Sequence, residues 1–239
     1  MKTTSVLSLL LVISFHSALA QESAETPLKT EVNVADADAT KMQGSYVGMF
    51  GENKITVRLE KVVGATVIGY SVVAGNERAF SGSFRKDGAN VLIDAKEPGD
   101  HPEDGAFTFA WNSTEKTLSG SWTPNDPKLA AKTFSLARRE FKYDPTVGSF
   151  PESSTRKLTE SEVEDKHSEE LRLMRNEIYA RHGYSFRLKE MREVFDTQNW
   201  YMPVSADVQN TLTKTEWEND ILIKRYEKYA KTHYDLYGR

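Results

Sequence analysis

The stretch KITVRLEKV, Lys54 to Val62, places Ile55, Val57 and Leu59 at every second position, with polar residues between them. A period of two is typical of a β-strand that buries one face and exposes the other. The same alternation returns in GAFTFAW and LSGSW further along the chain. This part of the chain is therefore predicted to form half-buried strands.

Short turns separate the predicted strands. Gly75-Asn76 and Asp87-Gly88 are dipeptides that favour tight hairpin turns. About eight strands are expected, beginning near residues 45, 54, 66, 77, 90, 106, 116 and 131. No connection is long enough for a crossover helix, so the strands should be antiparallel. Residues 42–143 are predicted to form an eight-stranded up-and-down barrel, because closure removes exposed sheet edges. The opening GSYVG resembles the first strand of small lipocalin-like barrels.

The interior of an eight-stranded barrel has room for side chains or for one small ligand. Seven aromatic residues are expected to supply enough bulk to fill it, namely Phe80, Phe84, Phe107, Phe109, Trp111, Trp122 and Phe134. A filled interior is therefore the first prediction. An open barrel that holds a small apolar ligand is the alternative.

The first residues have the features of a secretory signal peptide. Lys2 precedes an apolar run from Val6 to Phe15, and Ala18-Leu19-Ala20 fits a cleavage site, so residues 1–20 are predicted to be removed. Residues 21–41 are polar and acidic, which favours a flexible leader. An exported chain without cysteine is more typical of a bacterial protein than of a disulfide-bonded secreted domain. A periplasmic or extracellular location is expected.

Composition limits the classes of partner. The chain has 31 Lys and Arg against 35 Asp and Glu, a formal net charge of −4, which does not favour nucleic acid. After the signal peptide no apolar run reaches the ~18 residues needed for a membrane span. Composition does not predict an oligomeric state.

A change of period follows residues 144–157, a segment rich in Pro, Ser and Thr that is predicted to be a linker. Residues 158–239 are predicted to form a small all-α domain. Thr159 with Glu162 and Thr213 with Glu216 match capping boxes, which mark helix starts. Helices are expected over residues 168–182, ending before a glycine, and over residues 188–195 and 214–232. The fold class is thus α+β in two domains.

The helix expected over residues 168–182 carries polar residues on its apolar side. Arg175 and His182 share a stripe with Leu171, Met174 and Ile178. Buried charged groups need partners, which the NWY turn or the last helix should supply. Arg175, Asn176, Glu177 and His182 are therefore assigned to a structural polar network. Glu177 and Arg181, spaced i,i+4, are expected to form a partly exposed pair.

These residues carry a resemblance to a known family. ELRLMRNEIYARHGYSF, then FDTQNWY and LTKTEWENDILIKRYEKY, resemble the YARHG domain, whose name repeats Tyr179 to Gly183. The resemblance covers about Leu158 to Tyr229. It implies a bacterial extracytoplasmic module, often found beside peptidases or kinases, whose molecular function is not established in general.

Glu177 lies about 100° or more around the helix from the stripe that contains His182, so no catalytic residues are predicted. Candidate binding residues for an acidic glycan or peptide are Arg175, Tyr179, Arg181, Trp200 and Tyr201.

No metal site and no cofactor are predicted, since the chain has neither cysteine nor a histidine pair at ligand spacing. The loop EPGDHPEDG gathers Glu97, Asp100, Glu103 and Asp104, but it lacks the EF-hand order and is expected to be a solvated acidic turn.

The leading hypothesis is a non-enzymatic exported envelope protein that binds a cell-envelope glycan or a protein partner. The alternative is a small-ligand carrier that uses the barrel. A hydrolase acting on envelope material, with Glu177 or a carboxylate of the acidic loop as the base, is the third hypothesis.

Overall fold

The structure is a computed structural model that describes residues 40–233. The predicted signal peptide, residues 1–20, lies outside the described residues. So does the predicted leader, apart from Thr40 and Lys41.

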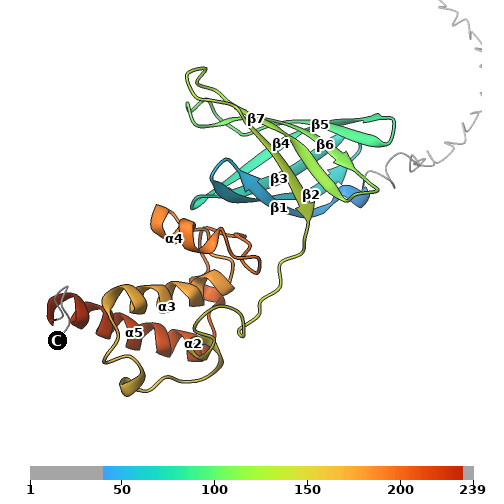
Figure 1. Cartoon of the computed structure of the whole chain (residues 1–239). Coiled ribbons are helices and arrows are strands. Elements are labelled where there is room, and N and C mark those ends of the chain that lie inside the picture. The colour runs from blue at the N-terminus through green and yellow to red at the C-terminus, as the bar shows by residue number, and fades with distance from the viewer. Residues whose placement is uncertain (1–39, 234–239) are drawn as a thin grey trace, which may run out of the picture. The chain divides into compact units, whose positions relative to one another are not determined.

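The N-terminal part of the described chain is a closed antiparallel barrel (Figure 1). Each strand pairs with the next, and β1 also pairs with β8 through Tyr46 with Arg138 and Val47 with Ala137. Every strand begins within one residue of its expected position, and the predicted eight-stranded up-and-down barrel is confirmed. The strands are β1 (Gly44–Phe50), β2 (Asn53–Val63), β3 (Thr66–Val73), β4 (Asn76–Asp87), β5 (Asn90–Lys96), β6 (Gly105–Asn112), β7 (Thr117–Pro124) and β8 (Lys132–Arg138).

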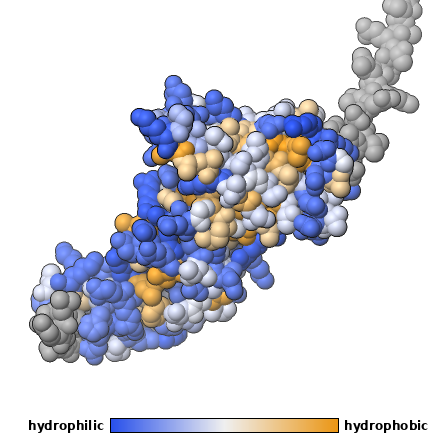
Figure 2. Space-filling view, turned by 45° about the horizontal axis from the view of Figure 1, so that its top comes forward, coloured by the Kyte–Doolittle hydropathy of each residue, from blue (hydrophilic) through white to orange (hydrophobic). Residues whose placement is uncertain are grey.

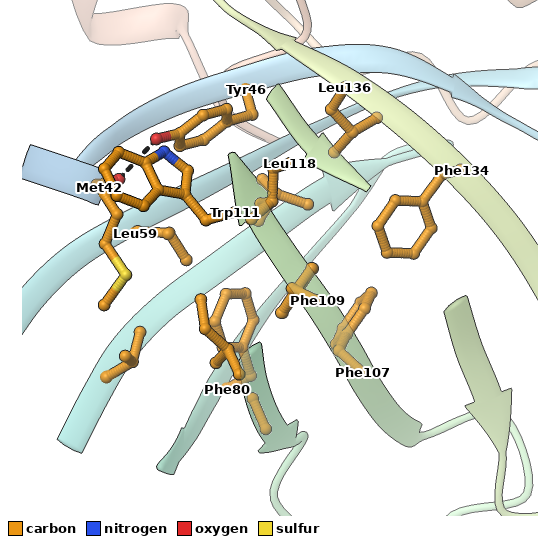
Figure 3. Close-up of a cluster of buried hydrophobic side chains, with 14 of the residues drawn as sticks. Met42, Tyr46, Leu59, Phe80, Phe107, Phe109, Trp111, Leu118, Phe134 and Leu136 are labelled. Atoms are coloured by element: carbon orange, nitrogen blue, oxygen red, sulfur yellow. Dashed lines mark hydrogen bonds between the residues drawn. The ribbon is translucent and has the colours of Figure 1, made fainter. Parts of the chain in front are cut away.

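One end of the barrel is packed with side chains. The short 3-10 helix η1 (Thr40–Met42) covers this end with the fully buried Met42, whose carbonyl oxygen accepts a hydrogen bond of 2.7 Å from the Tyr46 hydroxyl (Figure 3). Further into the barrel, toward the opposite end, Phe107 and Phe109 are stacked with ring centroids 5.0 Å apart, and Phe80 lies 5.6 Å from Phe109. Aromatic rings in such arrangements stabilise a core beyond the area that they bury.

The opposite end of the barrel is less densely filled. Trp122, which was expected to help fill the interior, is only partly buried there. Phe84, which was also expected to fill it, is partly buried too, but it lies toward the other end of β4, where its N–H donates to the Ala65 carbonyl at 3.1 Å. A cavity of about 440 Å³ lies at the end where β1 meets β2 and β3 meets β4. The prediction of a filled interior is therefore right for one end and wrong for the other. The physical reason is that alternation predicts which residues point inward but not how much of the space they occupy.

The C-terminal part is helical, as predicted. Its elements are α2 (Glu152–Thr155), η2 (Glu160–Glu162), α3 (Ser168–Arg181), α4 (Lys189–Phe195), η3 (Gln209–Thr211) and α5 (Lys214–His233). Both capping boxes are present. At the start of α5 the Glu216 carboxylate accepts from the Thr213 N–H at 2.9 Å, while the Glu216 N–H donates to the Thr213 hydroxyl at 3.2 Å. At η2 the Thr159 box with Glu162 is also formed. Gly183 follows α3 with φ of +77°, a left-handed backbone that suits glycine.

Helix α3 is covered on two sides. Its apolar stripe, which includes Leu171 and Ile178, packs against Ile223 of α5 (Figure 1). On the other side Ala180 packs with aromatic residues that include Phe186. Two small cores thus fix this helix, because an amphipathic stripe must be buried to be stable.

Turns of the barrel bond to the segment that follows α3. The Gly75 N–H donates to the Ser185 hydroxyl at 2.9 Å, and Arg187 Nε donates to the Gly75 carbonyl at 3.3 Å. At the start of β2 the Lys54 N–H donates to the Asp196 carboxylate at 2.9 Å. These bonds join backbone groups to side chains more than a hundred positions away, so sequence periodicity contains no sign of them.

Large apolar residues are exposed on both the barrel and the helices, for example Ile68 and Trp217. Hydrophilic residues cover much of the face in Figure 2, and apolar residues interrupt them in patches. None of the helices over residues 40–233 combines the length and the apolar character required to cross a bilayer.

Candidate functional site

Helix α5 supplies partners for the two polar residues that α3 turns inward. His182 Nε2 lies 2.8 Å from a Glu216 carboxylate oxygen, and Arg175 Nε lies 2.9 Å from Glu227. The Tyr143 ring stacks on the imidazole at 4.5 Å, and its hydroxyl donates to Glu216 at 3.0 Å. Burial and the Glu216 charge raise the pKa of Tyr143 to about 12, so this hydroxyl stays a donor. His182 is buried and Arg175 largely so, and the partners come from the last helix.

The contact between His182 and Glu216 makes the stability of the fold depend on pH in the acid range. Burial by itself raises its pKa, but hydrogen bonds from His182 and from the Thr213 N–H outweigh that effect and hold the pKa at about 2, against an ordinary value of 4.5. A carboxyl whose pKa is lower in the folded chain stabilises the fold above its unfolded pKa. That contribution is lost as the pH falls through the folded pKa.

We therefore expect the stability to decrease between about pH 4.5 and pH 2, with on the order of 2–3 kcal/mol traceable to Glu216. Urea unfolding, followed by circular dichroism at a series of pH values, measures this change. Glu162, which arginine and backbone bonds also hold at a pKa of about 2, titrates in the same range. Glu216→Gln should flatten the profile by more than the matched Glu162→Gln. Equal effects of the two variants would show that Glu216 is not the main acid-sensitive group.

Glu177 and Arg181 form a buried ion pair, with side chains 4% and 0% exposed. The prediction of a partly exposed pair is wrong. The reason is that residues 147–154, part of the segment expected to be a linker, fold over the pair. Arg181 donates to the Val147 carbonyl at 2.8 Å and to the Ser153 and Ser154 hydroxyls.

Glu177, the anion of this pair, is also bonded to the folded-over segment. It accepts the N–H groups of Ser149 at 2.8 Å and Phe150 at 2.7 Å. Two backbone N–H groups and a guanidinium therefore donate to this buried carboxylate, which satisfies its oxygen acceptors. Glu177 and His182 share no partner in the described contacts, so the two side chains do not converge on one reacting atom.

The remaining candidate residues differ in how far they reach solvent. The Tyr179 hydroxyl donates to the Asp220 carboxylate at 3.1 Å, and the residue as a whole is partly exposed. Asn176 donates to the Arg172 carbonyl within its own helix. Tyr201 is buried, its hydroxyl donates to Tyr184 at 2.6 Å, and burial raises its pKa.

Of the five binding candidates, burial thus removes Arg181 and Tyr201 from the surface. Arg175, Tyr179 and Trp200 keep some exposure. Their role in binding stays a prediction.

A second site lies in the cavity at the open end of the barrel, where the alternative of an open barrel with a small apolar ligand would place it. Its walls are mainly apolar and aromatic, and charged residues lie among them. A volume of about 440 Å³ falls within the usual range of small-molecule sites. The lining residues used below are Phe50, Val73, Arg78, Glu97, Glu103, Phe107, Trp122 and Lys132.

The acidic loop contributes to this cavity. Glu97 and Asp104 are buried, so the prediction of a solvated acidic turn is wrong for these two residues. Glu97 accepts hydrogen bonds from the Gly105 N–H at 2.7 Å and from Trp122 Nε1 at 3.1 Å. Asp104 is paired with Arg78 at 3.0 Å. In the sequence, the only indication of a site here was the cluster of carboxylates beside a strand end. This cluster does not distinguish a loop in solvent from a loop folded into the barrel.

Comparison with known proteins supports the assignment of the helical part. Residues 149–228 match the YARHG domain, a domain of exported proteins. Searches of curated proteins and of solved structures returned no match. The match begins before Leu158, which agrees with the bonds that tie Ser149 and Phe150 to α3. The chain therefore carries a YARHG domain at residues 149–228, preceded by an eight-stranded antiparallel β-barrel.

Proposed function

We propose that this protein is a non-enzymatic exported binding protein whose barrel takes a small molecule into the cavity at its open end. The observation that carries the proposal is the contrast within the barrel. One end is packed with aromatic side chains, and the other keeps about 440 Å³ among Phe50, Phe107 and Trp122. A concave, mostly apolar space with a few polar groups is the usual form of a ligand site.

Native mass spectrometry of the purified chain tests this proposal. We expect an extra mass of a small molecule that is lost on denaturation. Val73→Trp fills the cavity with an indole and should remove the extra mass. The matched control Val63→Trp places the same ring at the opposite, exposed end of the strands and should retain it. If wild type and both variants carry no ligand, and no apolar dye binds to the wild type, the carrier function is refuted.

A second candidate function, binding of a cell-envelope glycan or protein, is supported by α5. Trp217 and Ile221 are 49% and 54% exposed and four residues apart, so they lie on one face of the helix. Exposed aromatic residues are typical anchors of binding surfaces.

Sedimentation with isolated cell walls and a pull-down from envelope extract test this second function. We expect Trp217→Ser combined with Ile221→Ser to reduce the bound fraction. The control Leu188→Ser removes an equally exposed apolar residue at the start of α4. Wild-type protein that stays entirely in the supernatant and captures nothing would reject envelope binding.

A further inference from the structure

Two opposite charges border the same aromatic ring in the barrel cavity. Glu97, directly after β5, accepts a hydrogen bond from Trp122 Nε1 at 3.1 Å. Lys132, the first residue of β8, has its ammonium 5.9 Å from the centroid of the Trp122 ring and 4.7 Å from that of Phe50. All four residues line the cavity. A ligand that lies against the indole would therefore be within reach of a carboxylate and of an ammonium.

Neither charge is matched by an ionic partner in the described part of the chain. Both hydrogen bonds to Glu97 end on its Oε2 atom, and no described donor reaches Oε1. Lys132 has its ammonium over two rings and forms no ion pair with a described carboxylate. Arg78, the other cation of the lining, is already neutralised by Asp104. Glu103 is exposed, where water solvates its charge.

A carboxylate held in an apolar surrounding without a cation is costly. Burial, with a smaller effect of the Asp104 charge, raises the pKa of Glu97 despite the bonds from Trp122 and from the Gly105 N–H and despite the charge of Arg78, which forms no ion pair with Glu97. An ammonium group placed on the free oxygen would offset the cost of burial. A ligand with a negative group alone would approach Lys132 but add a second negative charge near Glu97.

We propose that the cavity binds a small zwitterion with an apolar body, of the class of an apolar amino acid. Its ammonium would bond to Glu97, its carboxylate to Lys132, and its apolar part would lie on Phe50 and Phe107. A hydrogen bond between an ammonium and a carboxylate is about 2.8 Å long and stronger than one between neutral groups. A zwitterion can form one such bond to Glu97 and another to Lys132, which are not bonded to each other. This inference rests on the small-molecule binding proposed above and specifies the ligand class of the same site.

Three small molecules that share a phenyl group and differ in charge test the proposal on the full chain. Free phenylalanine carries both charges, phenylpropionate only the negative charge and phenethylamine only the positive one. Binding is measured by calorimetry and by the indole N–H resonance of Trp122, which is assigned among the four tryptophans by its loss in Trp122→Phe. We expect phenylalanine to bind at least about tenfold more tightly than either analogue, since each analogue lacks one of the two charge-assisted hydrogen bonds.

Two variants test which residue binds which charge of the ligand. Lys132→Met should abolish the preference for phenylalanine over phenethylamine. Glu97→Gln, which keeps an oxygen to accept the bonds from Trp122 and Gly105, should abolish the preference over phenylpropionate. Lys128→Met removes an exposed lysine of the β7–β8 loop outside the cavity lining and should leave all three affinities unchanged.

The outcomes separate this inference from the function on which it rests. If an apolar dye or one of the singly charged probes binds at Trp122 as tightly as phenylalanine, the ligand class is wrong while small-molecule binding stands. If neither the dye nor any probe shifts the Trp122 resonance, both are overturned. The comparison of probes on the unmodified chain gives this answer even if a variant fails to fold.

Discussion

Arg181→Met is expected to lower the free energy of unfolding by about 3–5 kcal/mol, because it leaves the Glu177 carboxylate buried without its cation. The variant also removes the donors that hold the Ser153 and Ser154 hydroxyls and the Val147 carbonyl. Urea unfolding followed by the helical circular dichroism signal measures the change. The loss should be the largest of any single charge removal in the YARHG domain.

The matched control is Arg172→Met on the same helix, whose guanidinium is partly exposed and forms no ion pair with a described residue. We expect it to change stability by less than about 0.5 kcal/mol. Adding Glu177→Gln to Arg181→Met should recover part of the loss, since it removes the uncompensated charge. An Arg181→Met effect no greater than that of Arg172→Met would mean that the buried pair is not what stabilises this helix against residues 147–154.

Phe109→Ala is expected to destabilise the barrel by about 3–5 kcal/mol, the usual range for removing a buried phenylalanine side chain. Phe109 is almost fully buried and lies 5.0 Å from Phe107, 5.6 Å from Phe80 and 5.7 Å from Phe134 between ring centroids. Because closed strands hold these rings on several sides, the space cannot collapse easily. Chemical unfolding followed by near-ultraviolet circular dichroism measures the effect.

Phe84→Ala provides the control for this prediction. Phe84 also packs against the barrel core but is only partly buried, so its removal leaves less of an empty volume. We expect a loss below about 2 kcal/mol, since the cavity cost depends on how enclosed the site is. Equal losses for the two variants would show that the degree of enclosure of the ring does not set the cost of its removal.

The barrel could be predicted from the sequence because its signals are local. The alternation through Ile55, Val57 and Leu59 places these residues on the buried face, and the structure buries all three. Turn residues such as Gly75 fixed where strands end. Likewise Thr213 with Glu216 predicted the start of α5, since a capping box involves residues only three apart.

The sequence predicts a partly exposed Arg181, and nothing in the sequence indicates that this residue is buried. Helical geometry puts it on the flank of α3, away from the apolar stripe. Its burial comes from Ser153 and Ser154, some 27 positions earlier, which bond to its guanidinium. A segment rich in Pro, Ser and Thr is typical of a linker, and the same hydroxyls are suitable partners for a buried cation.

Sequence by itself determined the order of the eight strands and of the helices α3, α4 and α5, the inward-facing residues of the barrel and the YARHG motif, because each depends on residues near one another in the chain. Only the tertiary structure decided that Arg181 is buried, that Glu97 turns into the barrel, and that one end of the barrel stays hollow. These features depend on how far separate strands and loops approach one another in space. A local period carries no information on that separation.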